Sequence, residues 1–97
     1  MNNDIKSTVE QHPKLSLKVN QDEIHRIMRD GVESGSLWIT PRSEYYRVCP
    51  TGEVESLLYN FLLVNFGTET WVNQSKKNWK IKNYGDVAKV IRHFGEL

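Results

Sequence analysis

The spacing of apolar residues along the chain predicts three helices. A lead helix is predicted over residues 20–34, because Asn20 and Glu23 form a capping box at its start and Gly35 suits the left-handed stop. A strongly apolar helix is predicted over residues 52–67 and a closing helix over residues 86–95. Each of them repeats apolar residues three and four positions apart and ends at a glycine.

Alternation of apolar and polar residues predicts the strands. SLWIT (36–40) and EYYRV (44–48) are separated by the turn PRS, and TETWVNQ (68–74) and NWKIK (78–82) form a second hairpin. KLSLKV (14–19) adds a short strand. The residues before it, 1–13, show no periodic apolar pattern, and we predict a flexible tail there.

The second half of the chain repeats the first at an offset of 33 residues. Sliding residues 38–61 onto 71–94 superposes Trp38 on Trp71 and Phe61 on Phe94. Two hairpin-plus-helix units after a lead helix give the order α-ββ-α-ββ-α. We therefore predict an α+β fold with a four-stranded antiparallel sheet, helices on one face, in a single domain over residues 14–97.

The repeat also predicts the core. Its apolar positions on the inward sides of helices and strands are Ile24, Ile27, Ile39, Val48, Leu57, Leu58, Phe61, Val72, Ile81, Val87, Val90, Ile91 and Phe94. Alternate strand residues point to opposite sides of a sheet, so Tyr46 and Trp79 also face the helices.

No fourth helix remains to cover the other side of the predicted sheet. That side and the adjoining hairpin tip carry aromatic, basic and amide residues, which is too much apolar and basic surface for a plain solvated face. The candidate partner-binding residues are Trp38, Tyr45, Arg47, Trp71, Asn73, Lys76, Lys77, Lys80 and Lys82.

Composition and charge narrow the function classes. A chain of 97 residues that is 38% hydrophobic makes one globular domain. It contains neither a signal peptide nor a membrane-length apolar run, so we expect a soluble, cytoplasmic protein without a membrane partner. The net charge of +1 hides a basic C-terminal third, because residues 71–97 contain six basic and two acidic residues.

The order of elements and part of the text resemble the LAGLIDADG homing endonucleases. LLYNFLLVNFG, ETWVNQSKKNWKIK and DVAKVIRHFGEL are similar to the family's second helix, second hairpin and closing helix. Gly35-Ser36 stands where the family motif ends in Gly-Ser, but Ser34 occupies the position of the metal-binding acid. Over residues 24–97 the resemblance implies a DNA-facing sheet without endonuclease chemistry, and a homodimer formed through residues 24–34.

Histidine and cysteine residues offer little catalytic chemistry. His12, His25 and His93 lie far apart and have no second His or Cys three or four positions away, so no zinc site is predicted. Cys49 is the single cysteine, which excludes an intrachain disulfide. It stands at a strand end followed by proline, where no helix terminus would activate the thiol.

Acidic residues give one further metal candidate. Asp30, Glu33 and Glu44 could gather around a magnesium ion, as nucleases require, but a solvated helix face explains them as well. We predict no enzyme, no cofactor and no metal.

Two functions remain open for the aromatic and basic face. The first is a small non-catalytic binding protein, an inhibitor or modulator of a larger protein or nucleoprotein machine of the kind that phages encode. Trp, Tyr and Arg are the residues of interface hot spots. The alternative is a DNA- or RNA-binding protein of LAGLIDADG-like fold, because lysines beside aromatic rings suit phosphate contact and base stacking. Nucleic acid would need Lys76 and Lys77, whereas a protein interface would centre on Trp38 and Trp71.

Overall fold

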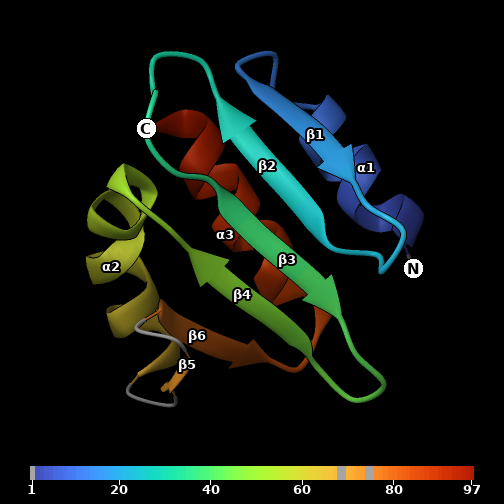
Figure 1. Cartoon of the computed structure of the whole chain (residues 1–97), viewed down its shortest axis with the longest axis vertical. Helices are drawn as coiled ribbons and strands as arrows, with labels where there is room; N and C mark the ends of the chain where they lie inside the picture. The colour runs from blue at the N-terminus through green and yellow to red at the C-terminus, as the bar shows by residue number, and fades with distance from the viewer. Residues whose placement is uncertain (1, 68–69, 74–75) are drawn as a thin grey trace.

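A computed structural model describes residues 2–67, 70–73 and 76–97, with side chains for residues 4–67 and 78–97. Within these ranges Figure 1 shows three helices and the strands of a single sheet. In chain order they are α1 (Asn2–Glu10), β1 (Leu15–Val19), β2 (His25–Arg29), β3 (Leu37–Pro41), β4 (Tyr46–Pro50), α2 (Glu53–Phe66), β5 (Thr70–Asn73), β6 (Lys76–Ile81) and α3 (Tyr84–Glu96).

The strands form one antiparallel sheet. Strands β1, β2, β3, β4 and β6 lie side by side in that order, and β5 extends the sheet beyond β6. The predicted α+β class is confirmed. The predicted four strands in the order α-ββ-α-ββ-α are wrong, because β1 and β2 precede β3 and four strands run consecutively after α1.

The lead helix predicted over residues 20–34 is instead a turn followed by β2 in the sheet. Asn20 Oδ1 accepts hydrogen bonds from the backbone N–H groups of Asp22 (2.9 Å) and Ile24 (3.0 Å), so the expected helix cap closes the β1–β2 turn. Glu23 has a φ of 62°, whereas α-helical residues have a negative φ, so no helix can pass through this position. The prediction of a homodimer through residues 24–34 assumed a helix there, and the structure has β2 in its place.

The stretch predicted as a flexible tail over residues 1–13 contains α1. Ile5 is fully buried and Val9 is 3% exposed, so one side of this helix belongs to the core. The Tyr84 hydroxyl on α3 donates a hydrogen bond to the carbonyl oxygen of Asp4 at 2.6 Å and lies 2.5 Å from the Thr8 hydroxyl. These contacts hold α1 against the closing helix.

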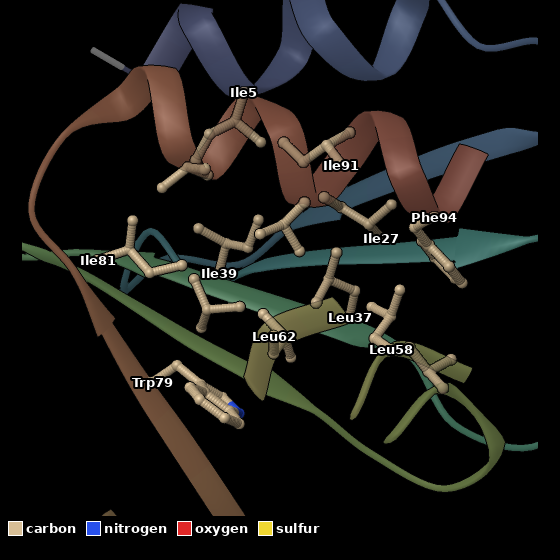
Figure 2. Packing of buried hydrophobic residues seen from close by; sticks show 14 of the residues in the cluster. Ile5, Ile27, Leu37, Ile39, Leu58, Leu62, Trp79, Ile81, Ile91 and Phe94 are labelled. Atoms are coloured by element: carbon tan, nitrogen blue, oxygen red, sulfur yellow. The ribbon is translucent and has the colours of Figure 1, made fainter. Parts of the chain in front are cut away.

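All three helices lie on one side of the sheet, and the core fills the space between the two layers (Figure 1). Figure 2 shows Ile91 of α3 and Leu62 of α2 directed toward the sheet residues Ile27 and Ile39. The predicted inward side is confirmed for Ile39, Val48, Ile81 and Trp79, which are at most 2% exposed.

Three residues of the predicted core are exposed or only half-buried, and a fourth lies outside the described side chains. Leu57 is 43% exposed, because Val54, Leu58 and Leu62 form the buried side of α2 instead. Phe61 is half-buried beside that stripe, and its ring stacks on His93 of α3 with 4.1 Å between centroids. Ile24 is also only half-buried, and Val72 lies outside the described side chains. The remaining predicted core residues are buried.

No helix in the ranges that the structure describes is long and apolar enough to cross a membrane.

Candidate functional site

The side of the sheet opposite the helices, called the open face here, carries most of the predicted binding residues. Directly paired residues of neighbouring strands point to the same side, so the register identifies its members. They are Ser16 and Lys18 on β1, Arg26 and Met28 on β2, Trp38 and Thr40 on β3, Arg47 and Cys49 on β4, and Asn78 and Lys80 on β6.

Like charges oppose each other twice on the open face. Lys18 pairs directly with Arg26 across β1 and β2, and Arg47 pairs with Lys80 across β4 and β6. Directly opposed like charges cost stability in a sheet. The ten described strand positions named above include four basic residues and no Asp or Glu. The open face therefore presents positive charge at two places about three strand spacings, or roughly 14 Å, apart.

Each cationic pair lies beside an aromatic ring. The guanidinium carbon of Arg26 is 5.3 Å from the ring centroid of Trp38, and Arg26 Nε donates a hydrogen bond to the Ser36 hydroxyl at 2.8 Å. The Lys80 ammonium is 5.1 Å from the ring centroid of Tyr45. Both distances lie within the range of cation–π attraction. The aromatic rings thus hold the cations in place along the sheet.

Thr51, the residue after β4, fixes the indole of Trp38. Its Oγ1 accepts hydrogen bonds from Trp38 Nε1 and from the backbone N–H of Ser36, each at 3.1 Å. It also donates to the Ser36 carbonyl oxygen at 3.2 Å. The half-buried indole is therefore attached to the backbone through one side chain.

This arrangement depends on a close approach between two glycines. A Cβ on Gly35 would lie 1.9 Å from the carbonyl oxygen of Thr51, and a Cβ on Gly52 would lie 2.8 Å from the Cα of Gly35. Their φ angles are +94° and +57°, which L side chains rarely adopt. The glycines let the chain before β3 cross the chain after β4, and this crossing places Thr51 beside Trp38.

A hollow of about 150 Å³ opens on this face between β3 and β4. Trp38 pairs with Cys49 and Thr40 pairs with Arg47, so each large side chain has a small one across from it. Thr40 and Cys49 are 6% and 7% exposed and form the floor, while Trp38 and Arg47 rise beside them. The alternation of sizes creates the hollow.

Arg47 is held in position from β6. Its Nε donates a hydrogen bond to Asn78 Oδ1 at 2.6 Å, and Asn78 is fully buried. A buried amide that accepts from a guanidinium orients the arginine without neutralising its charge. This contact places Arg47 beside the hollow.

Four of the predicted binding residues come together on the described part of the open face: Trp38, Tyr45, Arg47 and Lys80. Lys82 is exposed immediately after β6. Trp71 and Asn73 belong to β5, and Lys76 and Lys77 to the start of β6, but their side chains lie outside the described residues.

The sequence prediction missed the residues contributed by β1 and β2. Lys18 and Arg26 form one of the two cationic pairs, yet Arg26 was expected on a helix. Residues 25–29 gave no strand signal, because each side of β2 carries both polar and apolar residues. Thr51 carried no signal, because its role depends on the chain crossing.

The described residues contain no group of three or more His, Cys, Asp or Glu side chains that could hold a metal ion. Asp30, Glu33 and Glu44 thus form no such group.

Comparison of the chain with protein-family models, with curated proteins and with solved structures found no match. The resemblance to the LAGLIDADG homing endonucleases stays a prediction.

Proposed function

We propose that this chain is a small non-catalytic binding protein that holds single-stranded nucleic acid against the open face of its sheet. The observation that carries the proposal is the pair of directly opposed cations at each side of the face, Lys18 with Arg26 and Arg47 with Lys80. Two cations side by side attract phosphate groups, so a nucleic-acid strand that lies over both pairs would gain affinity from each of them.

The neighbouring groups support the choice of nucleic acid. Arginine guanidinium planes and aromatic rings both stack on bases, and Arg26 lies over Trp38 while Lys80 lies over Tyr45. A strand of nucleic acid crossing the sheet would meet one cationic pair, then the aromatic centre, then the second pair.

A second candidate is the inhibitor or modulator of a larger protein, and the hollow favours it. A cavity of about 150 Å³ walled by Trp38 and Arg47 has room for one side chain of a partner. Tryptophan and arginine around such a pocket are typical of interface hot spots. This interface would have Trp38 at its centre and would depend little on salt.

Fluorescence anisotropy with labelled single-stranded DNA and RNA at low salt tests the proposal. The variant Lys18→Glu/Lys80→Glu reverses the charge of the lysine in each cationic pair, and both lysines are exposed, so it should abolish binding. The matched control Lys89→Glu/Arg92→Glu makes the same charge change on exposed positions of α3 and should retain most of the affinity.

Two outcomes would overturn the nucleic-acid proposal. One is the absence of measurable affinity of the wild-type protein for either polymer at low salt. The other is an equal loss of affinity in the variant and the control, which would mean that net charge, and not the open face, governs binding.

A further inference from the structure

We infer that the outer edge of β1 is a pairing surface for a second copy of this chain, joined in one specific register. The inference does not rest on the proposed function, because it concerns the edge of the sheet and not its open face. The sheet order places β1 at one end, where β2 occupies only one of its two sides (Figure 1).

The backbone N–H and carbonyl groups of successive β1 residues point alternately toward β2 and away from it. The N–H of Asp30 donates to the Lys14 carbonyl at 2.9 Å, and the N–H of Asn20 donates to the Ile24 carbonyl at 3.2 Å. In an antiparallel pair every second residue makes these bonds, so the even-numbered residues of β1 face β2. The N–H of Leu15 agrees with this alternation. It points away from β2 and donates a hydrogen bond to the backbone carbonyl of His12 at 3.0 Å. The polar backbone groups of Leu17 and Val19 therefore point outward.

Space for another strand exists along this edge. A hollow of about 560 Å³ runs beside β1, lined on the strand by Leu15, Ser16, Leu17 and Val19 and on the other side by residues of α1 and the turn after it. Residues from both faces of the strand line it, as expected for a hollow at the edge of the sheet. Val19 is 51% exposed, so pairing would also cover apolar surface.

Charge favours one register for pairing with a second copy. Antiparallel pairing centred on Leu17 places Leu17 opposite its equivalent, Leu15 opposite Val19, and Lys18 opposite Ser16 of the other chain. Moving the centre by one residue places Lys18 opposite either Lys14 or the second Lys18, which is repulsive. The Leu17-centred register thus pairs all five residues of β1 without opposing two lysines, and its two-fold symmetry is the usual one for a dimer.

This register also satisfies the outward backbone groups. The two Leu17 residues form a hydrogen-bonded pair and exchange N–H and carbonyl contacts. The N–H of each Val19 donates to the Leu15 carbonyl of the other chain. The exposed edge, an aggregation hazard in a monomer, becomes the centre of a continuous sheet.

A charge swap at Ser16 tests the inference. Ser16 is exposed, so neither substitution disturbs the core. In the dimer Ser16→Glu places a carboxylate opposite Lys18 twice and Ser16→Lys places an ammonium there twice. The dimer dissociation constant should therefore fall and rise by roughly tenfold, respectively. The controls Ser43→Glu and Ser43→Lys make the same changes on the exposed β3–β4 turn and should leave it unchanged.

Sedimentation velocity from low micromolar to millimolar protein provides the readout. The wild-type chain should reach twice its monomer mass, and Leu17→Pro, which removes an N–H that the β1–β2 ladder does not use, should remain monomeric. A wild-type chain that stays monomeric throughout the range would overturn the inference. A dimer whose dissociation constant changes in the same direction in Ser16→Glu and Ser16→Lys, or changes in neither, would also overturn it. This comparison does not depend on whether Leu17→Pro folds.

Discussion

The indole N–H of Trp38 donates a hydrogen bond to the hydroxyl of Thr51 at 3.1 Å, and this contact joins β3 to the turn between β4 and α2. The same hydroxyl bonds both backbone groups of Ser36. One small side chain at a strand end thus determines where the aromatic centre of the open face lies.

Replacing Thr51 with Val removes three hydrogen bonds and keeps the shape of the side chain. Trp38 Nε1 and the Ser36 N–H then lose their acceptor, so the free energy of unfolding should fall by about 1–3 kcal/mol. Urea denaturation measures the change. Thr51→Ser retains the hydroxyl and should lose less than half as much. Equal losses in the two variants would mean that the methyl group, and not the hydroxyl, stabilises this junction.

Alanine at Gly35 should be far more costly than alanine at Gly31. Both glycines have positive φ, +94° and +85°, so both substitutions carry the conformational cost of roughly 1–2 kcal/mol. Only Gly35→Ala also drives a Cβ into the Thr51 carbonyl, whereas the space around Gly31 is open within 4 Å. We expect Gly35→Ala to lose roughly 3 kcal/mol or more. Similar thermal midpoints for the two variants would contradict the close crossing at Thr51.

Phe94 and Phe61 should differ as core residues although the 33-residue repeat treats them as equivalent. Phe94 is fully buried, so Phe94→Ala should cost about 3–5 kcal/mol. Phe61 is half-buried and stacks on His93, so Phe61→Ala should cost roughly 1–2 kcal/mol. Chemical denaturation of both variants gives the comparison, and a loss at Phe61 as large as that at Phe94 would contradict the placement of α2.

Tyr84 makes the attachment of α1 dependent on pH. Burial, with a smaller contribution from the nearby Asp4 carboxylate, raises the pKa of the Tyr84 hydroxyl above its ordinary value of about 10. The folded state therefore holds the proton more tightly than the unfolded state does. The resulting stability is complete below the unfolded pKa and is lost as pH rises through the folded pKa.

Tyr84→Phe tests this dependence. The variant lacks the hydrogen bond to the Asp4 carbonyl and should be about 1 kcal/mol less stable than wild type at neutral pH. That difference should shrink above pH of about 10, because wild type then loses the stabilising protonated hydroxyl. Denaturation curves of both proteins at several pH values measure it. A difference that stays constant up to the highest pH would show that the hydroxyl does not titrate in this range.

The sequence predicted the second half of the fold better than the first. The hairpin of β3 and β4, the helix α2, strand β6 and the helix α3 follow clear periodic patterns, and Asn83 caps α3 by accepting a hydrogen bond from the backbone N–H of Asp86. The inward side of β3, β4 and β6 was also predictable, because an apolar residue recurs there at every second position.

The first half misled prediction because polar residues occupy inward positions of β2. His25 is 1% exposed and its Nδ1 lies 2.7 Å from the Glu23 carbonyl, while Arg29 donates to the carbonyl of Phe94 at 2.6 Å. Both residues find partners that only tertiary structure supplies, so the alternation of a strand was hidden. Without β2 the cationic pair of Lys18 and Arg26 could not be predicted.

The salt dependence of nucleic-acid binding tests the central claim, that two cationic pairs on the open face contact phosphates, most directly. The slope of log affinity against log salt should be negative for wild type and less steep by roughly 1.4 in Lys18→Ala/Lys80→Ala, because each lost contact with a single strand contributes about 0.7. The control Lys89→Ala/Arg92→Ala should keep the wild-type slope. An unchanged slope in Lys18→Ala/Lys80→Ala, or no measurable binding by wild type at low salt, would contradict the claim.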